Sequence, residues 1–211
     1  MSSQVRGGTR WKRFAIVMVP SVVATAAVGV GLAQGALAAS FSVSGQSFKV
    51  HADSLVGHDF VQYGSVATGR NPDGKGGDAH AVAVSGFSSA TITNMCQSVV
   101  TPNLPFGLGT VTLRLTAGTN PKKPVEATNL YLDIASLQAD ATFDHLDIGV
   151  AAQEAGIQPG TEKKVDPDGF AQRAKSATLT NVKQEAWATT AGTFKLSNLK
   201  LGLTSGKAEC Y

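Results

Sequence analysis

The chain has 211 residues, of which 18 are Lys or Arg, 15 are Asp or Glu and 43% are hydrophobic. Four basic residues lie within the first 13 positions and no acid precedes Asp53, so residues 40–211 carry 14 basic against 15 acidic side chains, a formal charge of −1. This charge argues against nucleic acid as a partner, because phosphate contacts need an excess of Lys and Arg. Two cysteines are too few for a disulfide-dense scaffold or a four-ligand zinc site.

The N-terminal segment has the pattern of an export signal. A basic stretch is followed by the uncharged residues 14–34 and by small residues that suit cleavage after Ala38. The apolar run 14–33 has 20 residues, about 30 Å as a helix, and is also long enough to remain in the membrane as an anchor. The alternatives are therefore a cleaved signal, which leaves a secreted protein, and a retained transmembrane helix.

Both alternatives predict the same location for the rest of the chain. The basic residues hold the N-terminus in the cytoplasm, which gives an N-in, C-out orientation. We therefore divide the chain into residues 1–39, a signal peptide or membrane-anchor helix in contact with the cytoplasmic membrane, and residues 40–211, an exported β domain. The length is consistent with one domain and an appendage.

Beyond residue 40 the hydrophobic pattern is that of β-strands. Apolar and polar residues alternate, or apolar residues run continuously, in segments 41–44, 48–50, 79–84, 111–115, 130–134, 194–196 and 199–203. A period of two predicts strands with one buried face. The best helical candidates, 137–141 and 151–155, are about one turn each, so an α/β fold with crossover helices does not fit.

A short pattern, Ala-Thr-apolar-polar-Asn/His-apolar, occurs three times. The copies are Ala90–Met95, Ala141–Leu146 and Ala177–Val182, with Asn94, His145 and Asn181 at the fifth position, and a looser copy contains Asn198. One extra residue interrupts the alternation at this position, and Asn tolerates a left-handed backbone, which predicts a bend between two short strands. The predicted fold is all-β, a single domain of short bent strands arranged as a sandwich, a curved sheet or an irregular β-solenoid.

Two polar loops contain closely spaced oxygen ligands. Asn71, Asp73 and Asp78 occupy one loop, and Asp166 and Asp168 occupy the other. Neither loop has the spacing of an EF-hand, so we interpret both as solvated turns, with calcium binding as the alternative. No metal site is predicted.

The two cysteines, Cys96 and Cys210, both lie in the segment predicted to be exported. An even number of cysteines in an oxidising compartment predicts a disulfide between them. The alternative is two separate buried thiols.

Catalytic motifs are weak. The nearest match to a serine-hydrolase nucleophile is Gly86-Phe-Ser88-Ser-Ala90, which lacks the final Gly, and the only following histidine, His145, lies at a bend position. Three acids, Asp140, Asp144 and Asp147, resemble a glycosidase pair in type, but on alternating strands they fit the solvent face. The remaining histidines, His51, His58 and His80, have no metal-binding spacing. We therefore predict no catalytic residue and no cofactor.

Several segments carry a resemblance to a known family. They are residues 4–14, 35–46, 93–99, 147–152, 186–196 and 209–211. Over nearly its whole length the chain resembles an actinobacterial, streptomycete-type exported family of unknown function whose members are often labelled cholesterol esterase. The resemblance implies export and pairing of Cys96 with Cys210, and it supplies no catalytic residue to carry over.

Two functional hypotheses follow. The first is a non-enzymatic protein of the cell envelope, a binding or structural β domain whose partner is an apolar, lipid-like molecule or another envelope protein. The second is a lipid or sterol ester hydrolase, as the family label says. An esterase requires Ser, His and a carboxylate within hydrogen-bond reach, with oxyanion donors nearby, and the fold discriminates between the two on this point.

Overall fold

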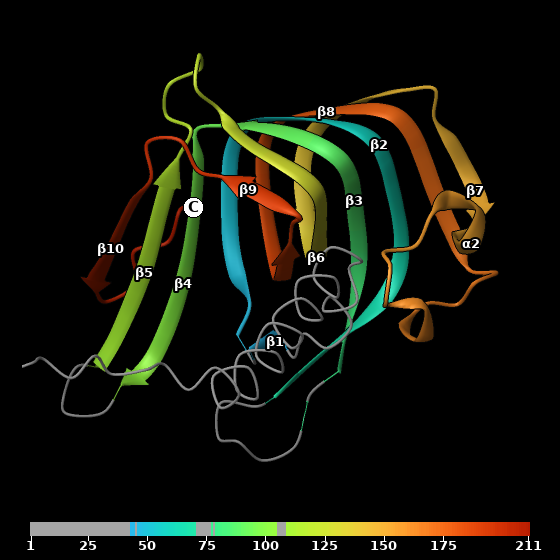
Figure 1. Cartoon of the computed structure of the whole chain (residues 1–211). Helices are drawn as coiled ribbons and strands as arrows, with labels where there is room; N and C mark the ends of the chain where they lie inside the picture. Colours follow the sequence, from blue (N-terminus) through green and yellow to red (C-terminus); the bar gives the residue numbers. More distant parts are fainter. Residues whose placement is uncertain (1–42, 45, 71–76, 78, 105–108) are drawn as a thin grey trace, which may run out of the picture. The chain divides into compact units, whose positions relative to one another are not determined.

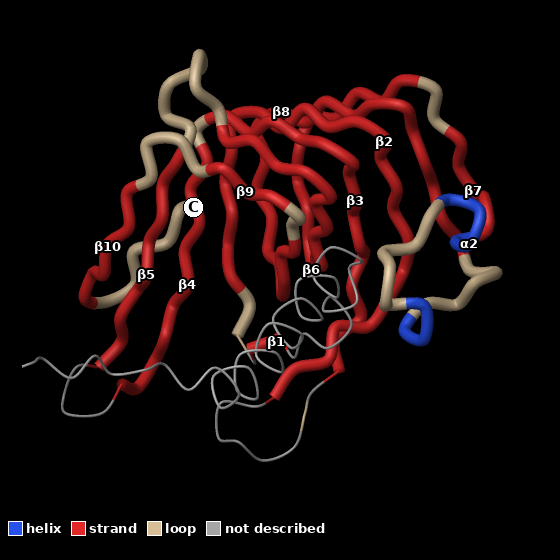
Figure 2. The backbone as a smooth tube through the Cα atoms, viewed as in Figure 1, coloured by secondary structure: helices blue, strands red, loops and turns tan. Residues whose placement is uncertain are grey.

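A computed structural model describes residues 43–44, 46–70, 77, 79–104 and 109–211. The predicted signal or anchor lies outside these residues. Nearly all of the described chain is β-strand, with one short helix, α2 (Ala152–Ala155), and one 3-10 turn, η2 (Glu162–Lys164) (Figure 2). The all-β prediction is confirmed. No helix among the described residues has the length and apolarity needed to cross a membrane.

Four long strands form a closed ring. They are β2 (Phe48–Arg70), β3 (Ala79–Thr93), β6 (Val125–Asp144) and β8 (Phe170–Thr190). Each pairs antiparallel with the next, and β8 closes the ring by pairing with β2 from Phe48↔Ala186 to Tyr63↔Ala171. In Figure 1, β2, β3 and β8 arch over side by side. We call β2, β3, β6 and β8 the ring.

Three further strands extend this sheet away from the ring. They are β4 (Met95–Leu104), β5 (Gly109–Ala117) and β10 (Lys200–Ser205), which we call the outer sheet. Three residue pairs, from Lys49↔Ser98 to His51↔Cys96, connect β4 to β2. The short strands β1 (Val43–Ser44), β7 (Asp147–Ala151) and β9 (Thr193–Lys195) pair with β2, β8 and β6 respectively.

The bends lie where the repeated pattern predicts them. Asn94, His145, Asn181 and Asn198 all have a left-handed backbone, with φ between 49° and 55°. Asn94 separates β3 from β4, His145 separates β6 from β7, and Asn181 lies within β8. Two of the side chains also bond to a carboxylate 41 residues earlier: Asn94 Nδ2 donates to Asp53 Oδ2 at 3.0 Å and Asn181 Nδ2 donates to Asp140 Oδ2 at 2.9 Å. The repeat is therefore a strand–bend–strand device, as predicted.

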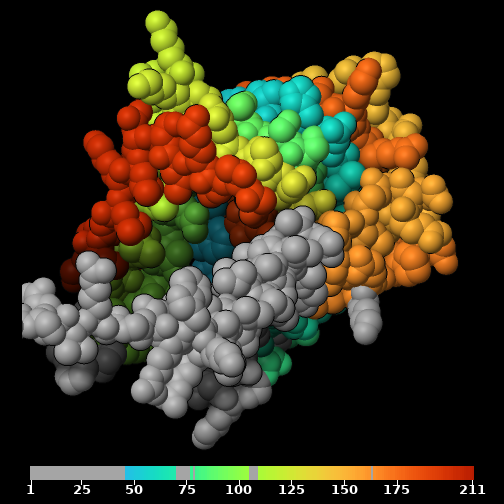
Figure 3. All heavy atoms as spheres, in the orientation of Figure 1, coloured from blue at the N-terminus to red at the C-terminus, as the bar shows by residue number. Residues whose placement is uncertain are grey.

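Two apolar clusters lie on opposite faces of the ring strands. The interior cluster includes Phe60, Phe87, Leu130 and Leu179, one or more from each ring strand. The second cluster lies on the outer face, where Ala152 and Ala155 of α2 and Val165 cover residues such as Tyr63 and Val84. Figure 3 shows residues of this covering segment in orange. The inner face of β2 and β3 is buried in the ring, and α2 with the loop after it covers part of their outer face.

The two helical expectations have different outcomes. Residues 152–155 form α2, within the predicted 151–155. The prediction of a helical turn at 137–141 is wrong, because these residues lie in β6 and pair with β8, for example Leu137↔Gln184 and Ala141↔Leu179.

Candidate functional site: a cavity inside the ring

The interior of the ring contains a cavity of about 170 Å3. Phe60 contributes to one wall, with its ring centroid 5.4 Å from that of Phe87 and 5.1 Å from that of Phe143. Leu132 of β6 and Leu179 of β8 also line the cavity, so all four ring strands contribute to it. The apolar alternation along each strand places these side chains on the inner face.

The cavity opens along the second half of β6. Up to Ile134 this strand pairs with β3, whereas from Ser136 to Asp144 its recorded pairing is with β8. The lining residue Leu137 in this half is 40% exposed, although it is a large apolar side chain. No strand among the described residues pairs with the other edge of this half of β6, and we interpret this edge as the entrance of the cavity.

Three polar side chains line this otherwise apolar space. Gln62 Nε2 donates to Ser85 Oγ at 2.8 Å, and Gln172 Nε2, from outside the lining, donates to Gln62 Oε1. The third, Gln184, is 4% exposed and pairs on its strand with Val50 on one side and Leu137 on the other. None of the described residues that line the cavity is ionisable, so this lining carries no charge.

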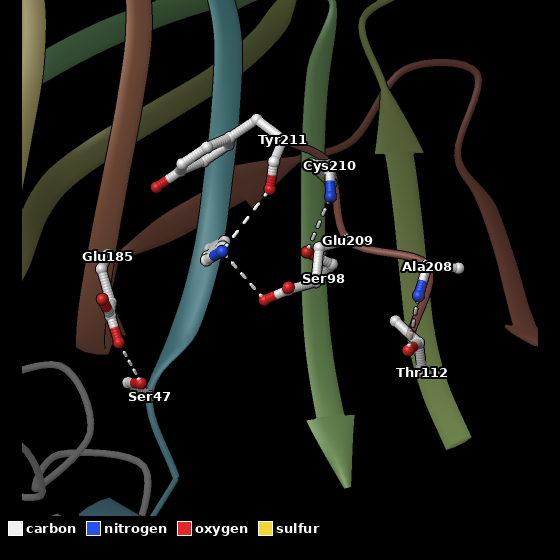
Figure 4. A network of polar contacts seen from close by, with 9 residues as sticks. Ser47, Ser98, Thr112, Glu185, Ala208, Glu209, Cys210 and Tyr211 are labelled. Carbon is white, nitrogen blue, oxygen red and sulfur yellow. Dashed lines mark hydrogen bonds and ion pairs between the residues drawn. The ribbon is translucent and has the colours of Figure 1, made fainter. Parts of the chain in front are cut away.

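The predicted disulfide is present in the structure. Cys96 of β4 bonds to Cys210, with a Cα–Cα distance of 5.9 Å across 114 positions. The cysteines are part of a wider set of contacts that holds the C-terminal tail against the sheet (Figure 4). Cys210 N donates to Ser98 Oγ at 3.1 Å, and Ala208 N donates to Thr112 Oγ1 at 3.1 Å. The tail thereby supplies hydrogen-bond partners to two hydroxyls that are almost fully buried.

A surface groove of about 410 Å3 lies beside this tail. The charged residues that line it contact other groups of the same chain. Lys49 Nζ lies 3.1 Å from Glu209 Oε1, and Ser47 Oγ donates to Glu185 (Figure 4). Trp187 at its edge stacks on His80, with 3.6 Å between ring centroids. These contacts hold the tail and the strand ends together.

The structure does not pair the serine and histidine weighed as an esterase site. Ser88 Oγ donates to Asp59 Oδ2 at 2.6 Å, so its partner is a carboxylate. His145 Nδ1 lies 3.0 Å from Asp144 Oδ1, and both side chains are exposed. Asp59 and His145 line a common hollow of about 270 Å3, but no hydrogen bond joins Ser88 to His145. Acyl transfer by this serine requires an imidazole to accept its proton.

The three acids of the repeat have separate partners. Asp140 accepts from Asn181, Asp144 faces His145, and Arg173 Nε donates to Asp147 at 3.0 Å. Each carboxylate thus belongs to a local contact of a bend or a strand pair, and the three do not face a shared space.

The remaining candidates for metal binding are dispersed. His51 Nδ1 lies 2.9 Å from the Val182 carbonyl oxygen, and His80 stacks on Trp187. Asp166 Oδ1 accepts from the Asp168 backbone N–H at 3.2 Å, as in a turn. Among the residues that the structure describes, no group of three His, Cys, Asp or Glu side chains is arranged to hold a metal ion. Asn71, Asp73 and Asp78 lie outside the described ranges.

Shifted pKa values occur at or near the second apolar cluster, at Glu162 and at the C-terminus rather than in the cavity. The backbone hydrogen bond from Gly160 lowers the pKa of the exposed Glu162 carboxyl. Burial raises the pKa of Tyr63, of Tyr131 and of the Asp133 carboxyl, and the Lys164 ammonium opposes the shift at Asp133. Burial also raises the pKa of Tyr211 at the C-terminus. Because none of these groups lines the cavity, its chemistry is that of an apolar space with neutral hydrogen-bonding groups.

Sequence reasoning identified the bends and the disulfide but not Gln62, Ser85 or Gln184. Each lies within a strand where a polar residue is typical of the solvent face. One signal did exist: Gln184 follows Asn181 by three positions, as Gln97 follows Asn94, and both glutamines line a smaller interior space of about 30 Å3.

Comparisons with known proteins place the chain in a family but give no named relative. No curated protein and no solved structure matches it. A family model matches residues 44–211. The chain belongs to this family, a family of unknown function designated DUF6230.

Proposed function

We propose that residues 40–211 are an exported, non-enzymatic binding domain of the cell envelope that holds an apolar molecule inside the ring. The observation that carries the proposal is the cavity, which is apolar, lined by all four ring strands and open along β6. Protein interiors have few voids larger than a water molecule, and an empty core volume costs on the order of 0.02 kcal/mol per Å3. A binding role gives a reason for the fold to keep this volume.

The size of the cavity limits what it accepts. Its volume of about 170 Å3 is close to that of apolar cavities, about 150 Å3, that bind benzene. A small ring or the end of a lipid chain fits inside, and the rest of a longer molecule extends past Leu137 through the entrance. The expected ligand is therefore bound by one end.

Two features support export. The basic and apolar N-terminal segment has the form of a signal or anchor. The disulfide between Cys96 and Cys210 is of a kind that persists outside the cytoplasm. Identification of the mature N-terminus distinguishes a cleaved signal from a retained anchor. An N-terminus at Ala39 or Ser40 indicates a secreted protein, and an intact chain whose membrane association resists extraction by salt indicates an anchor.

Ligand binding is tested by titrating the purified protein with toluene. The full chain is produced in a host that exports it, and methyl resonances of Leu132 and Leu179 are followed by NMR. We expect saturable shifts that disappear in Ala139→Leu, which fills the cavity, and persist in the control Ala135→Leu, which lies on the same strand outside the lining. No saturable shift in the wild type, up to the solubility of toluene, contradicts the proposal.

The alternative, a lipid or sterol ester hydrolase, makes a separate prediction. We expect any ester turnover to be unaffected by Ser88→Ala and His145→Asn, because these residues share no hydrogen bond and His145 stands at a bend that other copies fill with Asn. Loss of a catalytic base lowers turnover about 10⁴-fold. Such a loss in either variant, with an unchanged circular dichroism spectrum, supports the hydrolase instead.

A further inference from the structure

Among the described residues that line the cavity, Gln184 is the one polar residue whose side chain bonds to no other described group. Gln184 as a whole is 4% exposed, and no hydrogen bond joins its carboxamide to another group of the described chain. Gln62 and Ser85, by contrast, bond to each other and to Gln172. Among the described residues, no fully buried side-chain N or O lacks a partner, so the carboxamide of Gln184 borders the open space of the cavity, where the polar group of a ligand can bond to it.

The position of Gln184 fits such a site. It lies between Val50 and Leu137 in the sheet, and Leu137 stands at the entrance of the cavity. It also lines both the main cavity and the smaller interior space, so its side chain borders apolar volume on two sides. A polar group of a ligand therefore meets Gln184 while the apolar part fills the cavity toward Phe60 and Phe143.

The charge of the lining restricts that polar group. Within the part of the chain that the structure describes, no Lys, Arg, Asp, Glu or His side chain lines the cavity. An ionised carboxylate or ammonium taken into this space loses its hydration and gains no opposite charge, which is strongly unfavourable. A hydroxyl or amide group remains neutral, and a carboxamide offers it both a donor, Nε2, and an acceptor, Oε1.

We infer that the ring cavity binds a neutral amphiphile, whose hydroxyl or amide group hydrogen-bonds to the Gln184 carboxamide while its apolar part occupies the cavity. The inference rests on the proposed function, since it specifies the ligand of the same cavity. It excludes free fatty acids and other anionic lipids as ligands bound by their polar end.

Toluene and benzyl alcohol test this inference because they differ by one hydroxyl group. Dissociation constants of both are measured by NMR titration of the full chain, purified in the form that the exporting host produces. We expect the ratio of the toluene constant to the benzyl alcohol constant to fall about three- to tenfold in Gln184→Leu, as one neutral hydrogen bond predicts. Benzoate is expected to bind the wild type at least about tenfold more weakly than benzyl alcohol, because a buried charge lacks a partner.

Two further variants make the result specific. Gln184→Met keeps the length of the side chain and removes the amide, so it should lower the ratio like Gln184→Leu even if leucine packs poorly. Gln97→Leu makes the same change at the corresponding position of another copy of the repeat, which borders the smaller space alone. The ratio should stay at the wild-type value in Gln97→Leu.

The possible failures are distinguishable. If neither compound binds the wild type, the proposed function is wrong and the inference falls with it. If toluene binds but the ratio is the same in the wild type, Gln184→Leu and Gln184→Met, the binding function stands and the role of Gln184 is wrong. Tight binding of benzoate likewise overturns the neutral ligand and leaves the cavity as a binding site.

Discussion

The ring and the outer sheet are built from the same alternating pattern, yet their apolar faces have different surroundings. In the ring, β8 pairs with β2 and the inner face becomes a core. In the outer sheet, Leu113, Leu201 and Leu203 share a face through the pairing of β5 with β10 and are 38%, 62% and 73% exposed. Alternation therefore predicts which side chains share a face, and closure of the sheet decides whether that face is buried.

The two regions are also held in different ways. The ring is held by an apolar core that all four of its strands share. The outer sheet is attached to the ring by three residue pairs between β4 and β2, by Met95 and Ala117, which belong to the same apolar core, and by the ion pair of Lys49 in β2 with Glu209 of the C-terminal tail. The disulfide and the bonds to Ser98 and Thr112 fix this tail to the outer sheet. Five predictions, each made with one or more substitutions, test how the two regions are held.

Removal of the disulfide should have the largest effect. Replacing Cys96 and Cys210 together by Ala should lower the free energy of unfolding by about 5 kcal/mol, because the bond closes a loop of 114 positions. Urea unfolding measures the loss. Hydrogen exchange should rise first in β5 and β10, and a rise confined to the ring would contradict the contrast between the two regions.

Matched leucine substitutions compare the two faces directly. Leu130 is fully buried in the ring, so Leu130→Ala should lower the free energy of unfolding by about 2 to 5 kcal/mol. Leu203→Ala in the outer sheet should change it by less than about 0.5 kcal/mol. Thermal unfolding of both variants is the measurement, and equal losses would show that the outer face is buried in solution.

Gln184→Leu should stabilise the unliganded protein. The substitution replaces a polar amide that borders the cavity by an apolar side chain that matches the rest of the lining, so the free energy of unfolding should increase by about 1 to 2 kcal/mol. Gln97→Leu, the control, should have a smaller effect because Gln97 is only partly buried. Destabilisation by Gln184→Leu of the same size would indicate that the carboxamide has a structural partner.

The bends should be sensitive to the side chain at their centre. Asn181→Ala should lower the free energy of unfolding by about 1 to 2 kcal/mol, because alanine resists the left-handed backbone and the bond to Asp140 is lost. Asn181→Gly relieves the backbone strain and should cost less. Chemical denaturation distinguishes them, and an equal cost would assign the whole effect to the side-chain bond.

The smallest expected effect concerns pH. Burial raises the pKa of Asp133 in the folded state, so the folded protein binds this proton more tightly than the unfolded chain and loses stability as the pH rises through that pKa. Asp133→Asn should therefore be more stable than the wild type at pH 7. The difference should vanish below the ordinary Asp pKa of 3.8. A variant less stable than the wild type at pH 7 contradicts this sign.

The sequence predicts local features of this fold well. Asn94 and Asn181 mark bends because the break in alternation and the tolerance of Asn for a left-handed backbone are both local properties. The other left-handed residues, such as Asp59 and Asn129, lie outside the repeated pattern and carry no such signal. The error at residues 137–141 arose because Ala and Gln favour a helix, whereas pairing with β8 determines a strand.

Closure of the ring and the cavity could not be predicted. The pairing of β2 with β8 joins residues more than a hundred positions apart, such as Leu55 and Leu179, and alternation is the same in open and closed sheets. The inward position of Gln184 depends on that closure, since without it a polar residue on a strand is expected to face solvent. The candidate site is therefore a property of the tertiary fold.

The central claim is that the ring interior, and not the exposed face of the outer sheet, binds apolar molecules. Diffraction from crystals of the protein pressurised with xenon tests it most directly, because xenon occupies apolar cavities. The account predicts a xenon peak among Phe60, Leu132 and Phe143, and none beside Leu201 and Leu203. An unoccupied ring interior, or xenon on the outer sheet alone, would contradict it.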